Sequence, residues 1–446
     1  MTPAPELEIT GGLLVGPGGV HPGTVQIAGG RIAGIAREAS GAAAETVDAA
    51  GLLVLPGMVD EHVHFMETAD PSREDWRHGS AAAAAGGVTT VVEHTHAAPV
   101  LRGPDVQDKR GFVEGRSWVD FGFAAHAFPE TLGEVAGLRD AGASFVKAFT
   151  CTTHGVPGLD PAAMLALLRE AAAAGVRVLV HCEDETISAA DEARLRAALR
   201  EDAGLLAEWR SSEAELAAVA VVTVLARLTG ARVTIAHASQ PDVLDLVRAQ
   251  NAAGATITVE TCPQYLLLDE AEVRAHGALR KFTPPARPSP AQDALWAAVA
   301  GSGVDLLAAD HAPSTRDQKL TGSLWDCPFG LPGVETVLPL ALAAVQEGRL
   351  GLERLVELYA AEPARQLGLW PRKGALLPGA DADLVLVDLR RRAPLRDADV
   401  VSKAGWTPFA GRLACTPIVA TYVAGRLVAH EGRVVADAPR GRFVGA

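Results

Sequence analysis

Eight short apolar runs, separated by longer segments of helical pattern, are the feature that most constrains the fold of this chain. The runs contain many β-branched residues, whereas the segments between them are rich in Ala, Leu, Glu and Arg. Regular alternation of strand and helix is typical of a parallel sheet covered by helices. Eight such units predict an α/β fold, a (β/α)8 barrel of the TIM type. The runs are residues 58–64, 88–93, 121–126, 144–149, 177–181, 232–237, 256–261 and 304–310.

The two ends of the chain differ in pattern from its middle. Residues 1–55 and 375–446 contain short strand-like pieces separated by Gly-rich turns, which predict one small β-sandwich built from both termini. We therefore expect these two segments to form a β-sandwich domain and residues 56–374 to form a catalytic barrel. Residues 183–215, a long, charged and Ala-rich stretch, are expected to be a helical excursion between the fifth and sixth strands.

The charge balance excludes some classes of partner. The formal net charge is −14, and the basic residues form no stripe. This distribution argues against nucleic acid or an anionic membrane surface and favours a small-molecule substrate. No apolar stretch approaches the roughly 20 residues that cross a bilayer. Five widely spaced cysteines without a C-x-x-C pair indicate reduced thiols, so we expect a cytoplasmic protein.

Two histidines, one residue apart, end the first apolar run. Residues i and i+2 of a strand share a face, so His62 and His64 can reach one metal ion. A single buried histidine is more often a hydrogen-bonded core residue than a ligand. Here, however, further polar residues stand in the other runs, and active sites of such barrels lie at the carboxyl ends of the strands. These residues are Lys147 in the fourth run, His181 in the fifth, His237 in the sixth and Asp310 in the eighth.

Lys147 needs a physical account of its own, because an ammonium group inside an apolar strand is costly unless it is neutral or paired. A neutral amine can react with carbon dioxide. The resulting carbamate is a long carboxylate whose two oxygens can bridge two metal ions. The alternative is a buried ion pair with an acid such as Asp310.

The motifs around these residues are PGMVDEHVH (56–64), GSAAAAAGGVTT (79–90), VHCE (180–183), ETCPQYL (260–266), PPAR (284–287) and DHAP (310–313). Further motifs are PFGLPGVE (328–335), EPAR (362–365) and GADADL (379–384). Together they resemble the amidohydrolase superfamily, and within it the cyclic amidohydrolases: dihydroorotase, allantoinase, and hydantoinase or dihydropyrimidinase. The resemblance covers nearly the whole chain.

The resemblance implies a binuclear metal centre. One ion is expected on His62, His64 and Asp310 and a second on His181 and His237, with carboxylated Lys147 bridging the two. Zinc is the expected metal, with manganese, iron or cobalt as alternatives. In such enzymes a metal-bound hydroxide attacks a ring amide, and Asp310 is expected to act first as base and then as acid. Relatives are often dimers or tetramers, so a homo-oligomer is expected.

Residues expected to contact the substrate depart from the patterns of the relatives. Dihydroorotases hold a carboxylate with an Arg, an Asn and a His at positions where this chain has Met66, His96 and Ser314. Loss of that Arg removes a bidentate, charge-assisted contact, although His96 or Arg73 could replace it. Thr152 stands where hydantoinases have a Tyr that stabilises the oxyanion, and we expect it to donate a hydrogen bond there.

The expected substrate is therefore a cyclic ureide or imide similar to allantoin or a substituted hydantoin. Alternatives are dihydroorotate bound through a non-standard carboxylate site, an acyclic amide, amine or ester, and a non-catalytic relative that keeps the barrel as a scaffold. Cys151 and His154 share the loop of Thr152 and could also line the pocket. The residues expected to contact substrate are Met66, His96, Thr283, Ser314 and Phe329.

Overall fold

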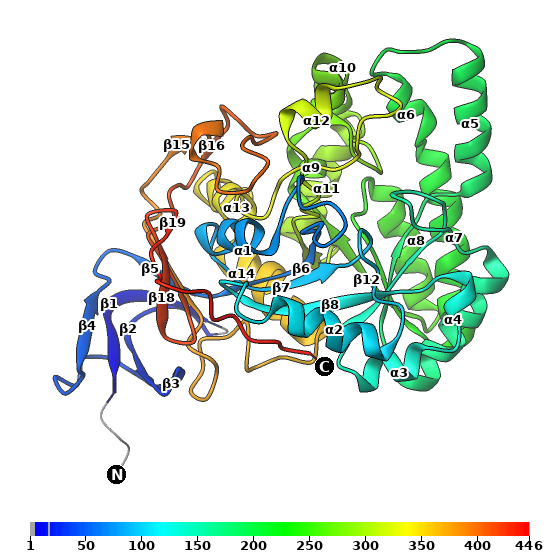
Figure 1. Ribbon diagram of the computed structural model, residues 1–446. Coiled ribbons are helices and arrows are strands. Elements are labelled where there is room, and N and C mark those ends of the chain that lie inside the picture. Colours follow the sequence, from blue (N-terminus) through cyan, green and yellow to red (C-terminus); the bar gives the residue numbers. More distant parts are fainter. Residues whose placement is uncertain (1–4, 17, 446) are drawn as a thin grey trace.

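A ring of eight parallel strands forms the centre of the computed structural model, which describes residues 5–16 and 18–445 (Figure 1). The strands are hydrogen-bonded in chain order. The ring closes where His64 N donates to His311 O at 2.7 Å and His311 N donates to His62 O at 3.3 Å. The predicted (β/α)8 barrel is confirmed. Its strands are β6 Met58–Val63, β7 Val88–His94, β8 Asp120–His126, β9 Phe145–Phe149, β10 Val178–His181, β11 Arg232–Ile235, β12 Thr256–Thr261 and β13 Leu306–Leu307.

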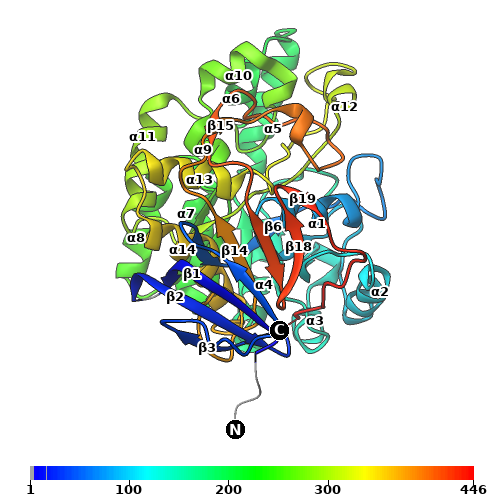
Figure 2. The ribbon, with the colours of Figure 1, turned by 90° about the vertical axis from the view of Figure 1, so that its left-hand side faces the viewer.

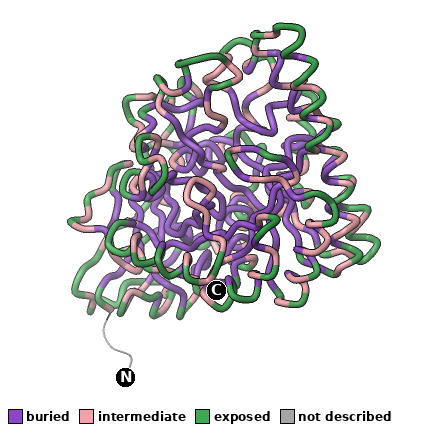
Figure 3. Tube along the Cα trace, turned by 45° about the vertical axis from the view of Figure 1, so that its right-hand side comes forward, coloured by how far each residue is buried: buried purple, intermediate pink, exposed green. Residues whose placement is uncertain are grey.

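Helices surround the barrel, and the buried residues, which include those of the barrel strands, lie in the interior of the molecule (Figure 3). The ends of α4 show how the sequence sets helix limits. Asp160 accepts a hydrogen bond from Ala163 N at 2.8 Å at its start, and Gly175 follows its last residue with φ 69°. The outer helices are α1 Trp76–Ala85, α2 Gly103–Val113, α3 Val135–Asp140, α4 Pro161–Ala174, α7 Ser212–Thr229, α8 Pro241–Ala252, α11 Ser289–Ala300, α13 Val337–Gln346, α14 Leu352–Val356 and α15 Glu362–Gln366. None of the described helices is both long and apolar enough to cross a membrane.

The charged stretch after β10 is helical, as predicted. It consists of α5 Glu185–Ala197 and α6 Leu205–Trp209, which precede α7. Trp209 packs against Trp325 and Phe329 with ring centroids 5.0 and 5.4 Å apart. Lys281 Nζ, in the loop after β12, lies 5.7 Å from the centroid of the Trp209 ring, so the excursion contacts the loops that follow β12 and β13. Those loops contain α9 Pro263–Leu267, α10 Glu270–His276 and α12 Arg316–Leu320.

Both ends of the chain form one separate β domain, as predicted (Figure 2). Its nine strands make a single hydrogen-bonded sheet in which β5 and β14 pair antiparallel and so join the two ends. Ile9, Val25, Val54 and Leu384 belong to a buried core of the sheet's own. The strands are β1 Leu7–Gly16, β2 Gly19–Ala28, β3 Arg31–Ala36, β4 Glu45–Asp48, β5 Leu53–Pro56, β14 Leu384–Val387, β17 Ala420–Val423, β18 Arg426–His430 and β19 Arg433–Val434.

Two parts of the C-terminal segment leave this sheet and contact the barrel. A short hairpin of β15 Ala393–Pro394 and β16 Leu413–Ala414 lies against α13, where Cys415 N donates to Pro339 O at 3.0 Å. The last residues run along β8, where Val444 N donates to Phe121 O at 2.8 Å. The barrel therefore receives support from residues far along the chain.

Candidate metal centre and active site

The six predicted metal ligands line one pocket at the carboxyl ends of the strands. The space within the pocket, counted together with the solvent at its open side, is about 360 Å³. The six ligands come from five strands, β6, β9, β10, β11 and β13, or from the residues just after them. Parallel strands of a barrel present their carboxyl ends to one rim, which brings these side chains together. The ligands are His62, His64, Lys147, His181, His237 and Asp310.

Three of these residues form a first group around one carboxylate oxygen. Asp310 Oδ1 lies 3.4 Å from His62 Nε2 and 3.3 Å from His64 Nε2. Asp310 follows β13 with φ 45°, a left-handed conformation that costs a residue with a side chain about 1–3 kcal/mol. Such a conformation persists only where the surroundings impose it, and here it turns the carboxylate toward the two histidines.

The second group is a pair of histidines from neighbouring strands. His181 Nδ1 lies 2.9 Å from His237 Nε2, so both nitrogens can bind one ion. The other ring nitrogen of His181, Nε2, lies 2.6 Å from the Glu183 carboxylate. Thr283 donates to the same carboxylate at 2.7 and 2.9 Å. This contact fixes the ring of His181 with Nδ1 toward the pocket.

A second buried glutamate, Glu260, fixes the ring of a histidine in the first group in the same way. Glu260 Oε1 accepts hydrogen bonds from His62 Nδ1 at 2.8 Å and from His237 N at 3.0 Å. It therefore contacts residues of both groups. Sequence reasoning did not identify Glu183 or Glu260 as site residues, although both stand in the motifs at 180–183 and 260–266.

Lys147 lies between the groups in a fully buried position. Its side chain is 1% exposed, and its Nζ donates no hydrogen bond to any residue that the structure describes. Burial lowers the pKa of Lys147 to about 8, because the charged form loses its hydration. The amine is therefore available in its neutral form near neutral pH.

The electrostatics of the pocket suit metal ions. Burial lowers the pKa of His62 and His237 well below the ordinary value, and neighbouring histidines and Lys147 lower it further. Neutral imidazole is the form that binds a metal. Neutral histidines around one carboxylate are ligands that divalent metal ions take in proteins, so the pocket fits metal binding.

Further histidines form the wall beside the first group. The ring of His94 stacks on His62 with centroids 3.8 Å apart, and His96 lies 4.3 Å from His64. His154 stacks on His96 at 5.3 Å. His96 and Thr283, two of the expected substrate contacts, line the pocket together with His154.

Comparisons with known proteins give the family of this chain. Residues 53–428 match the model of the amidohydrolase family. An allantoinase from Rubrobacter xylanophilus is 36% identical over 98% of this chain and 97% of its own length. A dihydroorotase from Halobacterium salinarum is 38% identical over 84% of this chain and 86% of its own length. The chain belongs to the amidohydrolase family.

A solved structure agrees with this assignment. The L-hydantoinase (dihydropyrimidinase) from Arthrobacter aurescens matches this amidohydrolase with a TM-score of 0.95 at 30% identity, over 99% of this chain and 100% of the other. The relatives are named dihydroorotase, allantoinase and hydantoinase, the three kinds of enzyme that the sequence motifs resemble. The predicted enzyme class, a cyclic amidohydrolase, is confirmed.

Thr152 is not brought to the histidines of this amidohydrolase. Its side chain is exposed, and it lines a different pocket together with Asp160 and Glu185. The reason is the path of the loop. Thr152 N donates to Glu185 and its hydroxyl accepts from Gly158 N at 3.3 Å, so the chain is held outward there, whereas His154 reaches the pocket.

Three other expected substrate contacts do not line the pocket that the described residues form. Met66 is 1% exposed with φ 60°, and Ser314 is fully buried. Phe329 approaches the pocket through His154, with ring centroids 5.8 Å apart. Among the described residues that line the pocket, Met66, Ser314 and Phe329 are absent. All three were expected from the resemblance to relatives. The loops bury Met66 and Ser314, whereas Phe329 stays partly exposed.

Two arginines stand near the pocket. Arg73 Nε donates to Pro313 O at 3.0 Å, which places the guanidinium beside the loop of Asp310. Arg210 donates to Cys151 Sγ at 3.4 Å and lies 3.6 Å from the Glu183 carboxylate. Burial lowers the pKa of Arg73, whereas Glu183 and Cys151 outweigh burial and raise the pKa of Arg210. Both groups add positive charge near the pocket.

Proposed function

We propose that this amidohydrolase opens the ring amide of a cyclic ureide or imide, similar to allantoin or a substituted hydantoin, with two divalent metal ions. The observation that carries the proposal is the convergence of four histidines, one aspartate and a partnerless buried lysine on one small pocket.

In this proposal each group of residues holds one ion. His62, His64 and Asp310 would hold the first, His181 and His237 would hold the second, and Lys147, as a carbamate, would bind both. Zinc fits imidazole and carboxylate ligands, and manganese, iron or cobalt fit the same set. When bound, such ions lower the pKa of water and polarise a carbonyl.

The residues of the chain supply the proton transfer and the orientation. Asp310, with its side chain 12% exposed at the pocket, takes the proton of the attacking water and returns it to the departing ring nitrogen. His154 offers a hydrogen bond to the substrate, because burial and neighbouring charges keep its pKa well below the ordinary value and a neutral imidazole still has one donor. Phe149 and Ala312 provide apolar wall.

The choice of substrate rests on relatives and on Met66. The match to the allantoinase spans nearly the full length of this chain and of the allantoinase, and the matching solved structure is an L-hydantoinase. Met66 is buried and offers no charged contact to a carboxylate. Dihydroorotate is the second candidate, supported by the dihydroorotase at 38% identity and by Arg73 next to the Asp310 loop.

We further propose that the protein is cytoplasmic and forms a homo-oligomer, a dimer or a tetramer. Light scattering of the purified protein tests the oligomer.

A panel of ring substrates tests the proposed activity. Enzyme loaded with zinc or manganese in bicarbonate is given allantoin, 5-substituted hydantoins, dihydrouracil, dihydroorotate and an acyclic amide, with Asp310→Asn as control. We expect turnover of allantoin or a hydantoin that the control loses. Preference for dihydroorotate would make the second candidate correct, and turnover of only the acyclic amide would refute ring opening.

A further inference from the structure

The loop that begins with Asp310 is anchored through the residue that follows it. His311 is fully buried, and its backbone bonds to His62 and His64 close the barrel. Its ring faces the opposite side, where Nδ1 accepts hydrogen bonds from Gly333 N at 3.0 Å and Val334 N at 3.3 Å. His311 therefore ties Asp310 to two neighbours at once, although it does not line the pocket formed by the described residues.

The chain at 330–334 can approach this loop because of its glycines. Ala312 N donates to Leu331 O at 2.9 Å. A Cβ on Gly330, which has φ 103°, would overlap the carbonyl oxygen of Ala312. This close approach gives a physical role to the motif at 328–335, which otherwise supplies no ligand.

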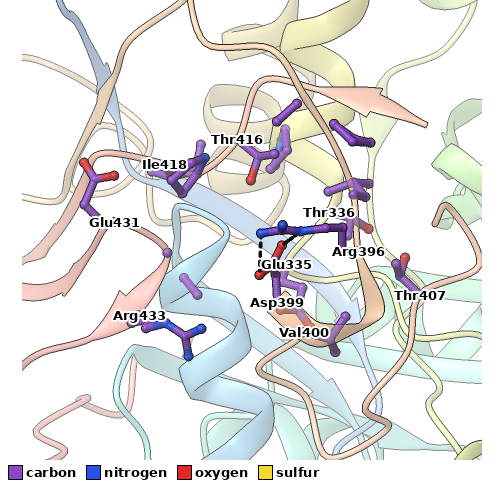
Figure 4. Close-up of a pocket in the computed structure, with 17 residues that line it drawn as sticks. Glu335, Thr336, Arg396, Asp399, Val400, Thr407, Thr416, Ile418, Glu431 and Arg433 are labelled. Carbon is purple, nitrogen blue, oxygen red and sulfur yellow. Dashed lines mark hydrogen bonds and ion pairs between the residues drawn. The ribbon is translucent and has the colours of Figure 1, made fainter. Parts of the chain in front are cut away.

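The same motif ends at Glu335, which reaches a distant part of the chain. The Glu335 carboxylate accepts hydrogen bonds from Val401 N at 2.8 Å and Ser402 N at 3.2 Å. Figure 4 shows Glu335 near Val400, at the wall of a cavity that Arg396, Asp399 and Thr407 also line. Residues 401 and 402 are thus fastened to the end of the glycine-rich loop.

From Ser402 the contacts lead back to His311. Ser402 Oγ donates to Glu74 Oε2 at 2.5 Å, and the same oxygen lies 3.4 Å from His311 Nε2. Glu74 and Ser402 are 0% and 3% exposed. His311 Nε2 has no hydrogen-bond partner among the described residues, so Glu74 and His311 are linked by close packing, whereas Ser402 and Glu74 are linked by a hydrogen bond.

A second contact from the same segment reaches the far end of the loop. Trp406 is fully buried and its Nε1 donates to Ser314 O at 2.8 Å. The segment 401–406 therefore contacts both the residues that hold His311 and the residue four positions after Asp310.

We propose that segment 401–406, together with Glu74 and His311, is a brace that positions Asp310. His311, Glu74, Ser402 and Trp406 are positioning residues that act through the backbone of residues 310–314. The brace maintains the left-handed conformation of Asp310, which is unfavourable by itself. The inference rests on the proposed function for the role of Asp310 in metal binding and proton transfer.

Two variants with matched controls test the brace. Ser402→Ala removes one buried hydroxyl, and Ser117→Ala removes another, whose Oγ donates to Val119 O at 2.6 Å before β8. Trp406→Phe removes one buried indole donor, and Trp296→Phe removes another, which donates to Leu266 O at 2.6 Å. The control substitutions remove similar hydrogen bonds at places that do not contact the Asp310 loop.

Two readouts separate positioning from general destabilisation. In the metal-free protein, hydrogen exchange of residues 310–316 should speed up in Ser402→Ala and Trp406→Phe and not in the controls. In the zinc-loaded protein, both variants should lose one metal equivalent to a chelator before the other, and kcat should fall about 10- to 100-fold with KM nearly unchanged. Equal behaviour of variants and controls in either readout would overturn the brace.

The outcome remains readable if the proposed function fails. A wild-type protein that binds no metal or opens no ring would refute the proposed function, while hydrogen exchange would still test the brace. Faster exchange throughout the barrel, rather than at 310–316, would show a purely structural role and would also overturn the inference.

Discussion

At the scale of single residues, Lys147 shows how much chemistry a sequence can reveal. A lysine in an apolar strand is unusual enough to predict a special role, and the structure shows a buried Nζ without a hydrogen-bond partner among the described residues. The contacts of Glu260 could not be predicted in that way. It stands 198 residues from His62, and only the closed barrel brings the two together.

Replacement of Lys147 tests its role as a bridge. Lys147→Met keeps an apolar side chain in the strand and removes the amine, so it should lower the metal content and reduce kcat/KM by more than about 100-fold. Lys147→Ala should show the same losses of metal content and kcat/KM. Added short carboxylic acid should restore some of its activity, because the acid can take the place of the carbamate. Full metal content in Lys147→Met would contradict the bridge.

His154 and Thr152 can be told apart by a pair of variants. His154→Phe keeps an aromatic ring in the pocket but removes its hydrogen-bond donor, and we expect kcat to fall about 100-fold if that donor stabilises the developing oxyanion. Thr152→Val should change kcat little, because Thr152 is exposed and lines another pocket. A large loss in Thr152→Val alone would restore the prediction made from the sequence.

At the scale of elements, strands were predictable and their ends were less so. Each of the eight predicted runs overlaps one barrel strand, because buried parallel strands need uninterrupted apolar residues. The eighth run, 304–310, contains only Leu306–Leu307 as strand. The backbone leaves the strand before Asp310, whose φ of 45° depends on contacts that no local pattern shows.

The glycine-rich loop over Asp310 gives a prediction at this scale. Gly330→Ala places a Cβ against Ala312 O and imposes φ 103° on alanine, so it should lower the free energy of unfolding by more than about 3 kcal/mol. Gly348→Ala, at φ 72° with nothing within 4 Å of the added Cβ, should cost about 1–2 kcal/mol. Urea denaturation measures both, and equal losses would show that the close approach is not tight.

At the scale of the whole molecule, the joint between barrel and β domain is a buried charge cluster. Lys373 is fully buried, and its Nζ lies 2.5 Å from Asp120, 3.0 Å from Asp381 and 2.6 Å from Asp383. Burial would lower the pKa of Lys373, but these carboxylates raise it above the ordinary value. The ammonium therefore stabilises the fold below its unfolded pKa, and this contribution is lost only as the pH rises through the folded pKa.

Removal of this ammonium should destabilise the fold without touching the pocket. Lys373→Met leaves buried carboxylates short of a cation and should cost about 3–5 kcal/mol at neutral pH. This loss of stability should shrink toward pH 4, because in the variant the carboxylates that lack the ammonium then take up protons. Arg390→Met, which breaks an exposed pair with Asp388, is the control and should cost little. A loss independent of pH in Lys373→Met would contradict the electrostatic account.

The sheet formed from both ends of the chain was predictable, whereas the course of residues 401–406 was not. Gly-rich turns and short strands at both ends predict one β domain, and β5 and β14 do pair. The segment around Ser402 and Trp406 has no regular pattern. Its contacts with Glu74 and Ser314 arise only from the packing of the complete chain.

The most direct test of the two-metal amidohydrolase is a metal titration with activity as readout. Metal-free enzyme in bicarbonate receives increasing zinc, and bound zinc per chain and the rate of ring opening of allantoin or a hydantoin are measured at each step. We predict that the rate rises until two equivalents are bound and that Asp310→Asn stays inactive throughout. Full activity in the metal-free enzyme, or with a single equivalent, would contradict the account.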